Sequence, residues 1–336
     1  MSSTIKPWKI AFLIFLIIGT IYILKNNSVT YKSNSGKIFG TYYNIIYKHK
    51  NDLKQDIVNV LNSVDNSLSP FNKNSIITAI NENRDIVPDS MFLRVFSMAQ
   101  HVSNETDGAF DITVAPLVNA WGFGFKKGIP ADSATIDSLR SYVGYTTVAY
   151  ENGKIVKNNP QTMLDCSAIA KGYACDEVAR MLRNMGITDF MVEIGGEVVT
   201  EGKNEKGNKW AIGISTPEEG ASHNDIQEII HISGKSMATS GNYRNYRYEG
   251  ERRVAHTIDP RTGYPVQHSL LSATVVADNC TTADALATAF MVMGIEEAIE
   301  YSNSHPEIDV YLIYSDSTGN FATCETEGMK RLHRNH

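Results

Sequence analysis

The chain has 336 residues, of which 42% are hydrophobic and 20% are charged, and its formal net charge is −6. This length leaves room for one large domain or two small ones with an ample core. The negative charge provides no basic surface, so we expect no nucleic-acid partner. The four cysteines form no CxxC pair and lack the histidine spacing of a zinc site, so we expect them to be small buried apolar residues.

The first 25 residues differ in composition from the rest. Two lysines precede an uncharged run over residues 10–24, and Lys25 closes it. A membrane-spanning helix needs about 20 residues, and counting back to Pro7 brings the run close to that length. We therefore expect an uncleaved signal-anchor over residues 1–25, with a cleaved signal peptide as the alternative. The leading lysines should stay in the cytoplasm, which places the body outside it.

The predicted elements alternate between helices and short strands without a regular βαβ rhythm, which favours an α+β fold. Residues 26–35 are polar and are predicted to be a linker, so the main domain is expected over residues 36–336. The other predicted elements, in chain order, are a strand at 37–47, helices at 52–67 and 89–104, a loop at 106–128, a helix at 167–186, short strands within 189–277, a helix at 281–294, and strands at 308–314 and 320–324.

The loop at residues 106–128 contains TDGAFDIT and then WGFG. Such a long loop is costly to order and often serves a function. Glycine lets the backbone approach a ligand, and Phe or Trp can stack on a flat ring. The alternative is a tight corner packed by aromatic side chains.

The segment DCSAIAKGYACD, residues 165–176, places a capping Ser and a lysine at the start of a predicted helix. The free N–H groups of a first helical turn bind anions, and Lys171 adds a positive charge. The spacing matches neither known glycine-rich phosphate loop. The alternative is a capped helix with an exposed lysine.

Two further stretches surround glycine-rich turns. In EIGGE, a strand ends in a glycine pair flanked by Glu193 and Glu197, which suits a tight turn or a close backbone approach. The hydroxyl-rich SMATSGNYRNY is followed by HTIDPRTG, where His256 beside Asp259 could orient a ligand or move a proton. Purely structural roles are the alternative for both.

The segment TTADALAT places Asp284 and Thr288 four residues apart on one face of an otherwise apolar helix. A carboxylate is costly to bury alone, and a carboxylate with a hydroxyl suits Mg²⁺ at a diphosphate. The alternative is that Asp284 complements the helix dipole. Together the five stretches indicate a planar ligand with phosphates, held by one metal.

The chain resembles the ApbE family of FAD:protein FMN transferases over roughly residues 37–329. The resemblance implies an α+β fold akin to the T-fold, with mixed or antiparallel sheets and packed helices after the N-terminal membrane anchor helix. The matching strings, in order, are GTYYNI, LSPFNKNSIITAIN, TDGAFDITVAPLVNAWGFG, LDCSAIAKGYACD, VEIGGEV, KWAIGI, ATSGNYRNY, HTIDPRTGYP and TTADALAT.

The resemblance also implies the site residues. Mg²⁺ would be held by Asp284, Thr288 and the backbone carbonyl of Ala168, and His256 and Asp259 are the candidate bases. Some relatives carry a further Asp where Ala287 stands, and many carry Tyr where Phe71 stands. FAD would be contacted by Phe39, Ser69, Pro70, Phe71, Ala109, Phe110, Asp111, Asp165, Lys171 and Ile258.

The implied reaction is Mg²⁺-dependent transfer of FMN from FAD to a threonine or serine hydroxyl of a target protein, with release of AMP. The alternatives are an FAD pyrophosphatase, which yields FMN and AMP, and a non-catalytic flavin-binding carrier. The implied acceptor is a subunit of a membrane electron-transfer complex, either sodium-pumping NADH:quinone oxidoreductase or an Rnf-type complex. The expected location is the bacterial inner membrane, with the catalytic domain on the periplasmic side.

Overall fold

The computed structural model describes residues 7–26, 29–126, 132–217, 226–242, 246–249 and 252–333. Parts of several predicted segments lie outside these ranges. They are residues 1–6 of the predicted anchor, 27–28 of the predicted linker, 127–128 of the glycine-rich loop, 218–225 and 250–251 of the region of predicted short strands, 243–245 of the hydroxyl-rich stretch and 334–336 of the predicted main domain.

The strands of the central sheet run antiparallel to their neighbours. They span Thr30–Ile38 (β1), Thr41–His49 (β2), Phe190–Ile194 (β5), Glu197–Glu201 (β6), Ser236–Gly241 (β9), Leu270–Ala277 (β12), Asp309–Ser315 (β13) and Phe321–Glu325 (β14). Within the described ranges this sheet has eight strands in the order β1-β2-β5-β6-β9-β12-β13-β14.

Two-stranded antiparallel ribbons lie outside this sheet. They are β3 (Val148–Glu151) with β4 (Lys154–Lys157), β7 (Trp210–Ser215) with β8 (Ile226–Ile232), and β10 (Tyr246–Glu249) with β11 (Arg252–Ala255). The combination of antiparallel strands and separate helices confirms the predicted α+β class.

The helices include the three strongest ones predicted from sequence. Asp89 caps α4 by accepting from the N–H of Phe92, Gly186 follows α7 at φ +75°, and Gly294 ends α8 at φ +84°. The helices are α1 (Pro7–Asn26), α2 (Lys54–Leu68), α3 (Ile76–Asn81), α4 (Ser90–Glu105), α5 (Ala115–Ala120), α6 (Ser133–Arg140), α7 (Ala170–Asn184), α8 (Cys280–Met293), α9 (Ile295–Ser304) and α10 (Glu327–Leu332).

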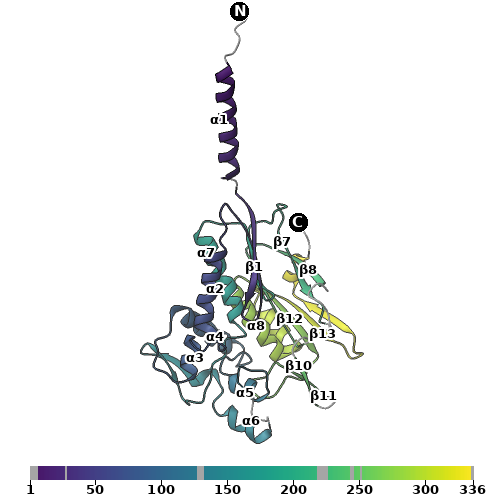
Figure 1. The fold of residues 1–336 in the computed structure, drawn as a ribbon. Helices are drawn as coiled ribbons and strands as arrows, with labels where there is room; N and C mark the ends of the chain where they lie inside the picture. Colours follow the sequence, from purple (N-terminus) through teal and green to yellow (C-terminus); the bar gives the residue numbers. More distant parts are fainter. Residues whose placement is uncertain are drawn as a thin grey trace, which may run out of the picture.

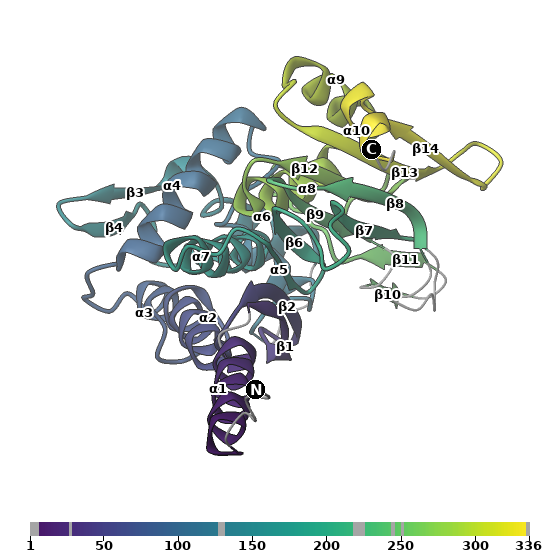
Figure 2. The same cartoon turned by 90° about the horizontal axis from the view of Figure 1, so that it is seen from above.

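The central sheet separates two cores, because side chains along a strand alternate between its faces. In β12, Val275 packs into the core under the helices, whereas Val276 packs into the second core. Helices α2, α4, α7 and α8 contribute to the first core, and the β7–β8 ribbon covers the second (Figure 2). A small third core joins α5 and α6 to Ile258.

The predicted linker and the predicted strand at 37–47 are both corrected by the hairpin β1–β2. Residues 30–35, predicted as linker, belong to β1 and pair with β2. β1 lies at the sheet edge, so polar side chains can face water while the backbone completes the ladder. A turn at Phe39 (φ +51°) and Gly40 (φ +73°) divides the predicted strand in two.

Helix α1 projects from the body of the protein (Figure 1), and its described apolar side chains are exposed. Within the described residues, no helix is both long enough and apolar enough to cross a membrane. The predicted membrane-spanning anchor is thus not found among the described residues.

Candidate active site

Helices α7 and α8 pack so closely that only glycine fits at position 172. A Cβ there would lie 2.3 Å from the carbonyl oxygen of Cys280 and 2.8 Å from Cβ of Asp284. This approach lets the N–H of Gly172 donate to Oδ2 of Asp284 at 2.9 Å. One carboxylate oxygen of Asp284 is thereby fixed by the backbone of α7.

Lys171 lies between two buried carboxylates. Its Nζ is 2.6 Å from Oε1 of Glu197 and 3.7 Å from Oδ1 of Asp284, and each carboxylate side chain is only 4% exposed. Burial alone would lower the pKa of Lys171, but Asp284 and Glu197 outweigh burial and raise it. Burial raises the pKa of Glu197 although Lys171 opposes that shift.

Glu197 carries a polar atom that its surroundings leave unsatisfied. Its Oε2 is buried and has no hydrogen-bond partner among the described residues. Glu197 was noted in the sequence only as a flank of the glycine pair. Its position at the start of β6, facing α7, is a property of the fold that the motif did not reveal.

The start of α8 is held by Asp176, a residue that no sequence motif pointed to. Its carboxylate accepts from the N–H of Cys280 at 2.9 Å and from the N–H of Thr281 at 2.8 Å. Burial raises the pKa of Asp176 although these hydrogen bonds oppose the shift. The first turn of α8 contains no acidic residue, so Asp284 is not the carboxylate that complements this helix end.

Thr288 lies one turn beyond Asp284 on α8 and contacts β9. Its Oγ1 is 3.1 Å from Oγ of Ser240, and either atom can donate. The hydroxyl-rich stretch is thus joined to the segment TTADALAT, as the predicted common site requires. Ser240 itself was not among the predicted residues.

The loop before α7 is organised by Asp165. Its carboxylate accepts from the N–H of Ser167 at 2.8 Å and from the hydroxyl of Ser167 at 2.5 Å, and burial raises its pKa. Its backbone N–H donates to the carbonyl of Ile112 at 2.7 Å, which joins the two loops. The expected Ser cap is wrong, because α7 begins at Ala170 without a side-chain cap.

Residues Ala109, Phe110 and Asp111 are all buried. Phe110 packs in the main core, so its ring is not an open platform for stacking. Asp111 accepts from both the N–H and the hydroxyl of Thr113 at 2.7 Å. Burial nevertheless raises the pKa of Asp111 to about 6.

The WGFG stretch is connected to the Pro-Arg-Thr-Gly turn. Nε1 of Trp121 donates to the carbonyl of Gly263 at 2.9 Å, and Trp121 shares the third core with Ile258. The Phe123 ring meets the His256 ring edge-on, with 6.4 Å between centroids. These contacts bring together two predicted stretches that are far apart in sequence.

Asp259 is engaged by Arg261 within the turn. Its Oδ1 accepts from the backbone N–H of Arg261 at 2.8 Å and from Nε at 3.1 Å, and its Oδ2 accepts from Nη2 at 3.3 Å. These three donors all belong to Arg261 and tie the Asp259 carboxylate to the turn.

The predicted flavin contacts near the N-terminus lie on loops and turns. Phe71 is 70% exposed, and its ring meets Phe125 edge-on at 6.1 Å. Ser69 and Pro70 are half-buried, and the carbonyl of Ser69 accepts from the hydroxyl of Ser75 at 2.7 Å. Phe39 packs against the main core at the β1–β2 turn.

The predicted metal ligands supply one carboxylate, one hydroxyl and one backbone carbonyl. In the described part of the chain, no three His, Cys, Asp or Glu side chains converge as a metal centre. Mg²⁺ is commonly held by one or two carboxylates together with waters and substrate phosphates, so this sparse set is compatible with it. Asp284 and Thr288, one turn apart on α8, supply oxygen ligands of the kind that this ion prefers.

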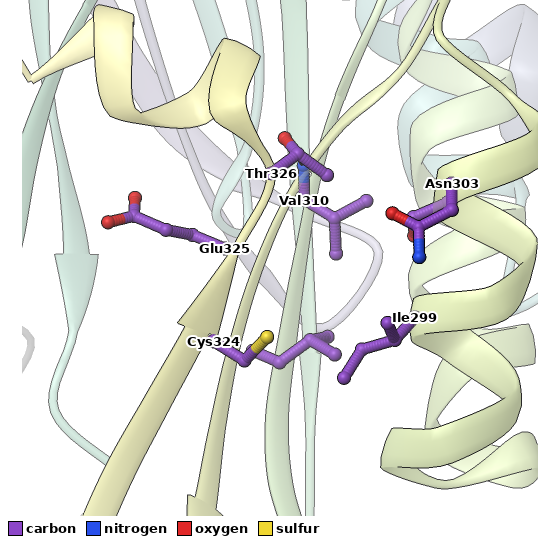
Figure 3. A pocket seen from close by; sticks show the side chains of 8 residues that line it. Ile299, Asn303, Val310, Cys324, Glu325 and Thr326 are labelled. Carbon is purple, nitrogen blue, oxygen red and sulfur yellow. The ribbon is translucent and has the colours of Figure 1, made fainter.

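The pocket in Figure 3 contains none of the predicted site residues. It lies between α9, which contributes Ile299 and Asn303, and the end of β14 with Cys324, Glu325 and the following Thr326. A second hollow adjoins the Pro-Arg-Thr-Gly turn. It is lined by Asp259, Thr262, Tyr264, Pro265, Val266, Gln267, His268 and Val292.

Comparison with known proteins identifies one family. The ApbE family model matches residues 39–312. The FAD:protein FMN transferase of Haemophilus influenzae is 35% identical over 318 residues, covering 89% of this chain and 91% of that protein. The Vibrio cholerae protein of the same name is 36% identical over 297 residues, covering 85% and 88%.

Solved structures agree with this result. The flavin transferase ApbE from Vibrio cholerae superimposes with a TM-score of 0.81 at 33% identity, covering 91% of this chain and 100% of that one. The Pseudomonas stutzeri flavinyl transferase ApbE, in its apo form, gives 0.81 at 29% identity, covering 91% and 97%. The chain belongs to the ApbE family.

Proposed function

We propose that this protein transfers FMN from FAD to a threonine or serine hydroxyl of a target protein. The relatives named as FAD:protein FMN transferases match it over most of their length. The observation that carries the proposal is the buried Asp284 carboxylate, oriented by Gly172 and placed beside Lys171. This arrangement suits a phosphorylated substrate better than a purely structural role, because burial of unbalanced charge is costly.

The bonds that change are those of the diphosphate. The acceptor hydroxyl oxygen forms a bond to the FMN phosphorus, and the bond from that phosphorus to the oxygen bridging to AMP breaks. AMP leaves with the electron pair, and the hydroxyl proton passes to a base. The Lys171 ammonium would stabilise phosphate oxygens during this exchange.

Asp284, Thr288 and the carbonyl of Ala168 would hold Mg²⁺. When bound, the ion would neutralise charge on the diphosphate and on the departing phosphate. The buried Asp284 supports this assignment, as does Thr288 on the next turn of the same helix.

Of the two candidate bases, we propose His256. Asp259 already accepts three hydrogen bonds from Arg261, and its role would be to hold the turn. His256 lies against Phe123 of the WGFG stretch, which ties it to the loop predicted to bind FAD. That loop contributes Ala109, Phe110 and Asp111, and the other proposed FAD contacts are Phe39, Ser69, Pro70, Phe71, Asp165, Lys171 and Ile258.

FAD pyrophosphatase activity is the second candidate, and the exposure of Phe71 is the observation that favours it. A side chain that is 70% exposed leaves the proposed flavin edge open to water.

The acceptor is proposed to be a subunit of sodium-pumping NADH:quinone oxidoreductase or of an Rnf-type complex. The proposed location of the catalytic domain is the extracytoplasmic side of the bacterial inner membrane, supported by the lysines that precede the apolar run.

The test combines the purified full chain with FAD, Mg²⁺ and a candidate acceptor subunit. Flavin fluorescence of the denatured acceptor band reports covalent transfer, and AMP release is measured alongside. We expect a fluorescent band that EDTA and Asp284→Ala abolish, while Asp278→Ala, at an exposed carboxylate, keeps it. AMP and free FMN without a labelled band would identify a pyrophosphatase, and bound FAD without either product would identify a carrier.

A further inference from the structure

Lys171 has two carboxylates within reach but bonds to only one of them. Its Nζ lies 2.6 Å from Oε1 of Glu197, which is a short charge-assisted hydrogen bond. The distance from the same Nζ to Oδ1 of Asp284 is 3.7 Å, which is too long for a hydrogen bond. The ammonium therefore hydrogen-bonds to Glu197 and forms only a longer ion pair with Asp284.

The two oxygens of Asp284 differ in what they contact. Oδ2 accepts from the N–H of Gly172 at 2.9 Å, and this bond is fixed by the packing of α7 on α8. Oδ1 is the oxygen that faces Lys171. A cation at Asp284 would therefore compete with the Lys171 ammonium for Oδ1.

Glu197 has the features of a side chain that decides this competition. It extends from the start of β6, where its backbone pairs with Ile194 of β5 in the central sheet. Its side chain is 4% exposed, and its Oε2 has no hydrogen-bond partner among the described residues. A buried carboxylate oxygen without a partner destabilises the folded state, and the packing of the fold alone does not explain its presence.

We propose that Glu197 is a positioning residue that keeps the Lys171 ammonium from hydrogen-bonding to Oδ1 of Asp284 and so leaves this oxygen available to Mg²⁺. This inference rests on the proposed function, because it concerns the metal assigned there. Without the Glu197 carboxylate, the flexible four-carbon stem of Lys171 lets the ammonium close onto Oδ1 of Asp284. The metal then loses both a ligand oxygen and the local negative charge.

The test measures Mg²⁺ binding to the full chain without FAD, by isothermal titration calorimetry. We expect Glu197→Gln to weaken Mg²⁺ binding by about 10-fold or more. This range is typical for the loss of a residue that orients a metal ligand without touching the metal. The double variant Glu197→Gln with Lys171→Met should bind Mg²⁺ within about 3-fold of the wild type, because the competing ammonium is gone. If Glu197 merely stabilised the fold, the second substitution would not be expected to restore Mg²⁺ binding.

Glu201→Gln is the matched control. Glu201 lies at the other end of β6 and pairs with Arg183 of α7 at 2.9 Å, so its loss removes an ion pair between the same two elements. It should leave Mg²⁺ binding unchanged, and thermal melting should show all variants folded.

Three outcomes would overturn the inference. Unchanged Mg²⁺ binding by Glu197→Gln would show that Glu197 does not control access to Asp284. A double variant as weak as the single one would make Glu197 a ligand or a purely structural residue. If the wild type binds no Mg²⁺, the assignment of Mg²⁺ to this site is wrong and the inference fails with it. The fluorescent-acceptor assay tests the proposed transferase activity separately.

Discussion

Asp176 on helix α7 accepts a 2.9 Å hydrogen bond from the backbone N–H of Cys280, the first residue of helix α8. The same carboxylate accepts from the N–H and the hydroxyl of Thr281. These bonds satisfy backbone donors that a helix start would otherwise leave unpaired. The helix that carries Asp284 and Thr288 is thus aligned by a residue of the helix that carries Lys171.

Replacing Asp176 with Ala should destabilise the protein by about 2 kcal/mol, because buried helix-start donors lose a charged acceptor. Urea unfolding measures this change. Asp278→Ala is the control, since Asp278 is 78% exposed in its pair with Lys235 and should cost less than about 0.5 kcal/mol. Equal losses in both variants would contradict the capping role.

Trp121→Phe should reduce both stability and FAD affinity. The change removes the N–H donor to the carbonyl of Gly263 and costs about 1–2 kcal/mol. It also frees the turn that carries Ile258 and Asp259, so the Kd for FAD should rise. Trp210→Phe removes an equivalent 2.9 Å bond to the carbonyl of Glu201 in the second core, and should lower stability with an unchanged Kd.

The stability of the protein should carry a pH signature from Asp111. Its pKa is raised by burial to about 6 in the folded state, whereas an unfolded Asp titrates near its usual value of about 4. Between these values the folded state binds more protons, so the contribution of Asp111 to stability falls as pH rises from about 4 to about 6.

Comparison with Asp111→Asn isolates this contribution. The free energy of unfolding of the wild type relative to the variant should decrease by up to roughly 3 kcal/mol across that window. Urea titrations at several pH values measure the difference, in which all other titrating groups cancel. A difference that stays constant with pH would show that folding does not shift the pKa of Asp111.

His256 and Asp259 should respond differently to substitution. His256→Ala should lower kcat for transfer by about 100-fold, the effect typical of losing a general base. Asp259→Asn should mainly destabilise the turn, because the lost charge is the partner of Arg261. Steady-state kinetics with the acceptor protein measures the loss of catalysis, and urea unfolding of the same variants measures the loss of stability. A larger kcat loss for Asp259→Asn would reverse the assignment.

The helices of the core could be predicted because their signals are local. Pro88 and Asp89 mark the start of α4, and Gly294 marks the end of α8. The apolar periodicity between such signals is independent of the rest of the fold. The edge strand β1 could not be predicted, because the polar residues 30–35 become a strand only by pairing with β2. Helix α9 was also missed, since it begins immediately after Gly294.

The residues of the candidate site also divide into those with a local signal in the sequence and those whose partners are distant in the sequence. Asp284 and Lys171 stood out because a charge inside an apolar helix or at a helix start is conspicuous in the sequence. The pairing of Lys171 with Glu197 was not predictable, because it depends on β6 lying beside α7 in the folded chain. The role of Asp176 was hidden for the same reason, since its partners at the start of α8 are more than one hundred residues away.

The contact between Gly172 and Asp284 joins residues 112 positions apart. Closing so long a loop costs chain entropy that must be met before the contact forms, so such contacts are slow and late in folding. A nascent chain emerging from the ribosome therefore lacks the site until helix α8 has been synthesised and has packed on α7. Under the proposed function, FAD would be bound only after helix α8 has packed on α7.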